Sequence, residues 1–156
     1  MKLKKILICA LAPVLLLCAC GPKDPAAAPY TLDDAQTLLD TGLFSADMGK
    51  IDDTYLISML YHVDESAIRE CVSWQATNTS ESADEVTVIV FSGEAAAVNA
   101  EAGFRQRVED QIQSLKDYAP AAIPHLEAAV IRRAGSTVLL AVGDPGGVAE
   151  AVDGLR

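Results

Sequence analysis

Apolar and polar residues repeat with two different periods along the chain, and these periods predict its helices and strands. A helical period predicts a first helix from Thr31 to Gly42, a short second helix over residues 54–61, and a long third helix over residues 94–118. Pro120 ends the third helix, because proline cannot continue the hydrogen-bond ladder. In the second helix we expect four apolar side chains to be buried, namely Tyr55, Leu56, Met59 and Leu60.

A two-residue alternation predicts the first pair of strands. Residues 68–77 place Trp74 on one face and Cys71 on the other. Residues 85–91 are apolar on both faces except at Thr87, a pattern typical of a central strand. The two segments are close in sequence, so we expect them to form a hairpin.

A second strand pair and a last helix follow. Strands are predicted over residues 126–133 and 136–142, with a tight turn at Gly135. Asp144 is expected to cap a helix that begins at Pro145. Strand-strand-helix order thus occurs twice. We predict an α+β fold with a four-stranded, mostly antiparallel sheet, helices packed on one face, and short N-terminal helices before it. A ββα-ββα pseudo-repeat and a plain antiparallel meander with added helices both fit this order.

The N-terminal segment has the pattern of a secretory signal peptide. Three lysines precede about a dozen apolar residues over 6–17, and small residues follow before Cys20. An uncleaved membrane anchor is the weaker alternative, because a spanning helix requires about 20 apolar residues. A secreted protein cleaved without lipidation would leave Cys20 unexplained.

Leu17, Cys18, Ala19 and Cys20, in that order, resemble the lipobox of bacterial lipoproteins. The resemblance implies that Leu17, Cys18 and Ala19 form the signal peptidase recognition site and that Cys20 is lipidated. It also implies anchoring to the cell membrane on its extracytoplasmic face, since two acyl chains hold a protein stably where one does so only marginally.

The predicted domain organisation follows from this segment. Residues 1–19 are the lipoprotein signal peptide. Residues 20–30 are the lipidated cysteine and a flexible tether rich in proline and alanine. Residues 31–156 are enough for one α+β domain and too few for two.

The charge of the chain limits its partners. The full sequence has a formal net charge of -10. Removal of residues 1–19 leaves nine basic and 22 acidic residues, a charge of -13. This sign argues against nucleic acid as a partner and against adhesion to anionic lipid headgroups. The acids form either a solvated surface or a docking face for a basic partner.

The cysteines argue against a disulfide framework. Cys9 and Cys18 leave with the signal peptide and Cys20 takes the lipid, so Cys71 is the one thiol of the mature chain. We expect Cys71 to be a small buried side chain and not a reactive thiol.

No sequence motif indicates catalysis. His62 and His125 are the two histidines, and neither has cysteine or histidine at zinc-ligand spacing. Adjacent acids such as Asp84 and Glu85 are expected to cap helices or face solvent. Residues 143–147 lack the Gly-Lys-Ser/Thr ending of a phosphate loop. We therefore expect no catalytic residue, no metal and no cofactor.

Two aromatic residues are candidates for a binding surface. Trp74 is the single tryptophan, and an exposed tryptophan on a sheet face suits ligand or peptide docking. Tyr118 is the second candidate. A strand tryptophan packed under a helix is the alternative for Trp74.

The second half of the chain carries a further resemblance. A Ser-Ala-Asp-Glu-Val segment precedes the strand at residues 85–91, and a helix through Arg107 and Gln111 leads to Tyr-Ala-Pro at 118–120. Pro-His-Leu-Glu, Ala-Val, Gly and Val-Leu-Leu elements then follow over residues 124–140. With the lipobox, this order resembles the lipoproteins of clostridial Firmicutes that carry domain of unknown function 4358. The resemblance implies a location and a class but no catalytic residue.

These observations favour a non-catalytic protein-binding or envelope-binding module. The open sheet face or a strand edge would be its docking surface. Its expected partners are the membrane, through the lipid on Cys20, and an unknown envelope protein or component. A small-ligand-binding transport accessory lipoprotein is the first alternative, and an envelope hydrolase that uses acids and a histidine is the second.

Overall fold

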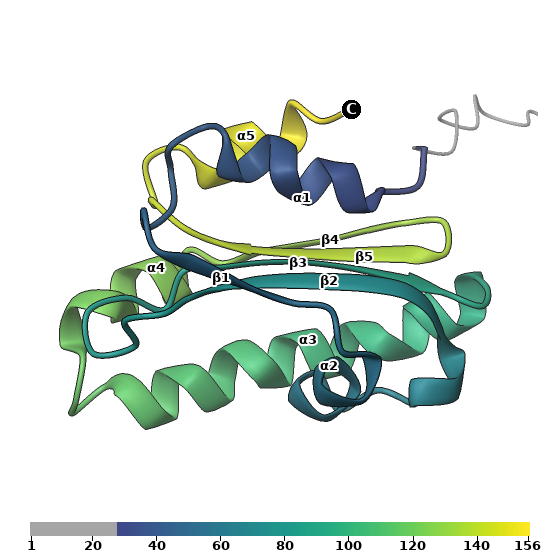
Figure 1. The fold of residues 1–156 in the computed structure, drawn as a ribbon, viewed down its shortest axis with the longest axis horizontal. Coiled ribbons are helices and arrows are strands. Elements are labelled where there is room, and N and C mark those ends of the chain that lie inside the picture. The colour runs from purple at the N-terminus through teal and green to yellow at the C-terminus, as the bar shows by residue number, and fades with distance from the viewer. Residues whose placement is uncertain (1–27) are drawn as a thin grey trace, which may run out of the picture.

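The computed structural model describes residues 28–156, which form three layers (Figure 1). The predicted signal peptide, the lipidation site Cys20 and most of the tether lie outside these residues. The helices are α1 (Leu32–Leu39), α2 (Thr54–Leu60), α3 (Glu94–Leu115), α4 (Ile123–Glu127) and α5 (Val148–Asp153), with short 3-10 turns at Glu65–Ala67 and Pro120–Ala122. The strands are β1 (Met48–Ile51), β2 (Ile68–Ala76), β3 (Glu85–Phe91), β4 (Val130–Ala134) and β5 (Thr137–Val142).

The middle layer is an open antiparallel sheet of five strands in the order β1-β2-β3-β5-β4. The prediction of a mostly antiparallel sheet is confirmed, but the prediction of four strands is wrong by one. The missed strand is β1, which has four residues, among them Gly49 and Lys50, and lies at the edge. So short a segment shows no alternation that a sequence pattern can detect.

Helices cover both faces of the sheet, so the prediction of helices on one face is wrong. In Figure 1, α1 and α5 lie on one side of the sheet and α2, α3 and α4 on the other. The chain has a separate apolar core on each side. Val88 and Leu139 lie in the core between the sheet and α1, whereas Ile89 and Leu140 lie in the core between the sheet and α3. The central strands are apolar on both faces, so both faces must be covered.

The two strand-strand-helix units recur in order but do not pack alike. β2, β3 and α3 form the first unit, and β4, β5 and α5 form the second. Phe104 of α3 is buried in one core and Val152 of α5 in the other, so the two helices cover opposite faces. The pseudo-repeat is therefore a repeat of element order only.

The buried side of α2 differs from the prediction. Tyr55, Leu56 and Met59 were expected in the core but are 62%, 45% and 59% exposed. The helix instead packs through Ile57 and through Tyr61, its C-cap residue, which are both fully buried. These two residues are four apart, so they lie on the same face of the helix.

Three boundaries also need correction. Residues 126–133 were predicted as a strand, but α4 occupies Ile123–Glu127 and β4 begins at Val130, because Pro124 suits the first turn of a helix. α3 ends at Leu115, three residues before the predicted end. α5 begins at Val148 with Gly147 as N-cap, since Asp144 closes a turn by accepting the Gly146 N–H at 2.7 Å.

The first residues that the structure describes are packed into the domain. Tyr30, assigned to the tether by the sequence, is buried, and its backbone N–H donates to Thr137 Oγ1 at 2.7 Å. The Arg156 guanidinium lies 3.8 Å from the centre of the Tyr30 ring and 3.2 Å from Asp34 Oδ2. Arg156 therefore packs against Tyr30 and Asp34, which lie at the N-terminal side of the described domain. Within residues 28–156, none of the helices is both long and apolar enough to cross a membrane.

Candidate functional site

A buried carboxylate lies between the sheet and α3. Glu85 is the first residue of β3, and none of its side chain is exposed. Alternation along β3 places Thr87 on the same face, and the β2 register sets Gln75 opposite Glu85 and Ser73 opposite Thr87. A buried charge is costly unless hydrogen bonds and an opposite charge compensate for it.

Four side chains outside β3 donate hydrogen bonds to the Glu85 carboxylate. Oε1 accepts from the Tyr61 hydroxyl and from Gln75 Nε2, the latter at 3.2 Å. Oε2 accepts from Arg107 Nη2 at 3.0 Å and from Gln111 Nε2 at 3.1 Å. α2, β2 and α3 thus each contribute to one carboxylate. We call Glu85 and these four partners the Glu85 network.

Two hydroxyl groups extend this network along the sheet. The Tyr61 hydroxyl oxygen lies 2.5 Å from Thr87 Oγ1, which lies 2.6 Å from Ser73 Oγ. Burial, and then the charge of Glu85, raise the pKa of Tyr61 well above its ordinary value. Tyr61 therefore keeps its proton and acts as a donor to Glu85.

The Arg107 guanidinium supplies the opposite charge. Its side chain is 15% exposed, so it is mostly out of water. Burial is the largest single effect and by itself would lower the pKa of Arg107, but the Glu85 charge, the Glu85 hydrogen bond and Tyr61 together outweigh it, and the pKa is raised. Arg107 and Glu85 therefore form a buried ion pair.

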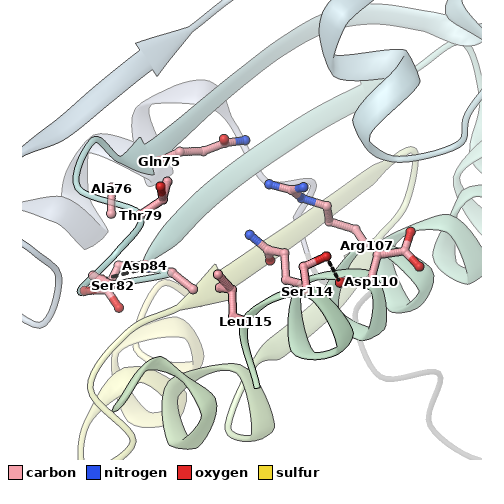
Figure 2. Close-up of a pocket in the computed structure, with 11 residues that line it drawn as sticks. Gln75, Ala76, Thr79, Ser82, Asp84, Arg107, Asp110, Ser114 and Leu115 are labelled. Atoms are coloured by element: carbon pink, nitrogen blue, oxygen red, sulfur yellow. Dashed lines mark hydrogen bonds between the residues drawn. The ribbon is translucent and has the colours of Figure 1, made fainter. Parts of the chain in front are cut away.

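A pocket of about 240 Å³ opens beside the Glu85 network. Side chains of β2, the β2–β3 turn and α3 line it, among them Gln75, Thr79, Arg107, Asp110, Gln111 and Leu115. Figure 2 shows Gln75 and Arg107 extending toward one another from the strand and the helix. The pocket therefore gives a bound molecule access to groups of the network and to an apolar wall.

Two polar atoms of this site have no partner. Among the described residues, Arg107 Nε and Gln111 Oε1 are buried side-chain atoms without a hydrogen bond. One is a donor and the other an acceptor, and each costs about 1–3 kcal/mol when left unsatisfied. Arg107 Nη2 and Gln111 Nε2, on the same two side chains, both donate to Glu85 Oε2. The site thus holds one unused donor and one unused acceptor, on two side chains that bind the same carboxylate oxygen.

Acidic groups near the pocket are already engaged. Asp84 is buried, and its Oδ1 lies 2.7 Å from His125 Nδ1 while its Oδ2 accepts the Ser45 N–H at 2.7 Å. Asp110 lies 3.2 Å from His62 Nε2 at the surface. Hydrogen bonds from Gln106 and then from His62 lower the pKa of Asp110. Both aspartates therefore have nearby histidine partners.

The structure does not bring together the two aromatic residues proposed as a binding surface. Trp74 is half-buried and packs against the core that contains α1. Tyr118 is 66% exposed and follows α3, in the layer that covers the other face. Trp74 and Tyr118 therefore lie on opposite sides of the sheet.

The other sequence candidates lie apart. His62 and His125 contact different aspartates, and no group of three or more histidine, cysteine or acidic residues in the described part of the chain could hold a metal ion. Cys71 is buried, and burial raises the pKa of its thiol. The predicted lipidation site and recognition residues, Leu17, Cys18, Ala19 and Cys20, lie outside the described residues.

The sequence did not identify the Glu85 network, although it carried one signal. Ala100 and Phe104 are buried on α3, and Arg107 and Gln111 continue the same helical face. Polar residues at core positions of a helix indicate a polar partner in the core. Glu85 itself was expected to cap a helix or face solvent, and its burial required the tertiary structure.

Comparison with known proteins gives one match. No similar protein was found among curated proteins, and no similar fold was found among solved structures. The family model described as a domain of unknown function, DUF4358, matches residues 41–143. The matched segment runs from the turn before β1 to the end of β5, so it contains the whole Glu85 network. Because the match covers more than half of the chain, this protein belongs to the DUF4358 family.

Proposed function

We propose that this chain is a lipid-anchored, extracytoplasmic binding module without catalytic activity, and that it binds an envelope component in the pocket beside the Glu85 network. The main support for this proposal is that the hydrogen-bonding positions of the Glu85 carboxylate are already occupied. Its carboxylate already accepts hydrogen bonds from Tyr61, Gln75, Arg107 and Gln111, and Tyr61 keeps its own proton. A general base needs a free lone pair within reach of the proton that it removes. The network therefore suits recognition better than proton transfer.

The charges of the site favour an uncharged ligand. Glu85 and Arg107 cancel one another, and the nearby Asp84 and Asp110 would repel an anion. A neutral group with both a donor and an acceptor, such as a hydroxyl or a secondary amide, would satisfy Gln111 Oε1 and Arg107 Nε. Both atoms are sealed from water, so the ligand would reach them through a rotamer change. N-acetylated sugars of the envelope carry such groups.

A thermal-shift titration with N-acetylglucosamine tests the pocket. At 100 times its dissociation constant, a ligand that binds only the folded state adds about 2.7 kcal/mol to the free energy of unfolding. We expect the wild-type protein to be stabilised, and Gln111→Leu to lose the effect. Glucosamine, which carries a charged amine, serves as the matched control probe. Absence of stabilisation by N-acetylglucosamine and other neutral sugars would remove the support for a sugar-binding pocket.

The anchoring part of the proposal is supported by the lipobox resemblance at residues 17–20. It rests on sequence alone and is tested separately, with Cys20→Ala in the native host. We expect the wild-type protein in the membrane fraction and the variant outside it. Cross-linking capture with both forms then identifies an envelope partner that depends on anchoring. A variant that remains in the membrane fraction contradicts lipid anchoring through Cys20.

A further inference from the structure

The outer face of α2 exposes three large apolar side chains. Tyr55, Leu56 and Met59 are 62%, 45% and 59% exposed. Met59 lies four positions after Tyr55 and three positions after Leu56, and both spacings place side chains on the same side of a helix, so the three form a single strip. We call this set the α2 strip. An exposed apolar cluster on a small domain is a common mark of an interaction site.

The fold does not need the α2 strip. The inner side of α2 packs through Ile57 and Tyr61, which are fully buried, and Asp53 caps the helix by accepting the Leu56 N–H at 2.8 Å. The described part of the chain leaves the strip uncovered. None of its three side chains belongs to either apolar core of residues 28–156.

Acidic residues stand at both ends of α2. Asp52 and Asp53 precede the helix, and Asp64 and Glu65 follow it closely in the next 3-10 turn. All four are exposed. The nearby Lys50 is already 3.2 Å from Asp52 Oδ2. The strip is therefore an apolar surface between two negatively charged ends.

We propose that the α2 strip docks a segment of another protein that carries apolar side chains flanked by lysine or arginine. Such a segment would bury the strip and place its cations against the acids, as in interfaces with an apolar centre and a charged rim. A lipid surface fits poorly, because anionic headgroups would repel the four acids. A second copy of this chain, docked through the same strip, would bring its own four acids against these acids.

This inference is independent of the pocket proposed above. Residues of the α2 strip do not line that pocket, which β2, the β2–β3 turn and α3 form. A partner at the strip and a ligand in the pocket can therefore be tested with separate variants.

Site-specific photocross-linking in the native host, with the full lipidated chain, tests the proposal. A photoreactive residue replaces Leu56, and the matched control position is Val98 on α3, which is 48% exposed. We expect a protein adduct at position 56 that is absent at position 98. Mass spectrometry should show lysine or arginine beside apolar residues in the cross-linked partner peptide.

Removal of acidic charges beside the α2 strip provides a second test, which is measured by the yield of the cross-linked adduct. Asn keeps the N-cap function of Asp53 and Asp64 but removes both charges. We expect Asp53→Asn with Asp64→Asn to lower the adduct yield about tenfold, as for loss of steering charges. Gln111→Leu should leave the adduct intact, which separates this result from the pocket. Lipid adducts, self-adducts, a partner peptide without cations, equal yields at positions 56 and 98, or no adduct would overturn the proposal.

Discussion

Glu85 shows how a single residue shapes both the stability and the chemistry of the site. Its side chain is fully buried beside Arg107, and desolvation of two charges offsets much of their attraction. Such a pair is favourable only while both partners and their hydrogen bonds remain. Loss of one partner leaves an uncompensated charge in the core.

We predict that Glu85→Ala lowers the free energy of unfolding by about 3–5 kcal/mol, because it leaves Arg107 buried without its counter-ion. Equilibrium unfolding in urea measures this change. The double variant Glu85→Leu with Arg107→Met should recover most of the loss, since replacing both charges with apolar groups is often neutral. A double variant as unstable as the single one would contradict this account of the pair.

Tyr61 gives a prediction for alkaline pH. Its folded pKa lies well above the ordinary 10.0, chiefly through burial. Below pH 10 both the folded and the unfolded protein keep this proton, so the full stability is present. At higher pH the unfolded tyrosine ionises first, and the free energy of unfolding falls by up to about 1.4 kcal/mol per pH unit. Tyr61→Phe should flatten this slope, as measured by urea unfolding between pH 9 and 11.

The Tyr61 prediction concerns how the free energy of unfolding changes with pH, and not its value at any one pH. The variant also loses the hydrogen bond to Glu85, so it is less stable at every pH. Contributions that the two proteins share cancel in the comparison of their slopes. Equal slopes would mean that Tyr61 ionises in the folded protein as it does in water.

At the scale of elements, α3 and the end of α2 approach one another closely. A Cβ added to Gly103 on α3 would lie 1.9 Å from the backbone oxygen of Tyr61. Only glycine lets these two helices pack at this distance. The approach also brings Tyr61 and Arg107 to the same carboxylate, so the helix contact and the site depend on each other.

We predict that Gly103→Ala lowers the free energy of unfolding by about 1–3 kcal/mol, although alanine is the better helix former. The added methyl group must push α3 away from Tyr61. Gly93→Ala is the matched control, because no atom lies within 4 Å of its added Cβ, and we expect a change below about 1 kcal/mol. Urea unfolding of both variants tests this, and an equal effect of the two substitutions would argue against the clash.

At the scale of the whole molecule, the sheet separates two cores. β3 and β5 lie at the centre, and every residue of β5 is buried. β1 is a four-residue edge strand whose residues are exposed or half-buried. Local opening is easiest where few apolar contacts must be broken.

We therefore predict that backbone amides in β3 and β5 exchange hydrogen most slowly and only through global unfolding. Amides of β1 should exchange faster, through local opening of the edge. Hydrogen exchange followed by NMR measures these rates residue by residue. Equal protection of β1 and β3 would show that the edge strand does not open separately.

The sequence predicted the site less well than the fold. Two histidines and two aromatics were its candidates, and the structure places them in separate surroundings. The residues that do converge are Tyr61, Gln75, Glu85, Arg107 and Gln111. No local motif unites them, because the contacts join residues that lie 10 to 26 positions apart along the chain.

What the sequence determined by itself is the local structure. β3 was predicted with the bounds that the structure shows, and β2 and β5 within one residue, because alternation is a property of consecutive side chains. The sequence also identified the DUF4358 family. Only the tertiary structure decided the strand order, the edge strand β1, the cover on both faces and the burial of Glu85. These features depend on long-range packing, in which residues distant in sequence compete for the same buried space.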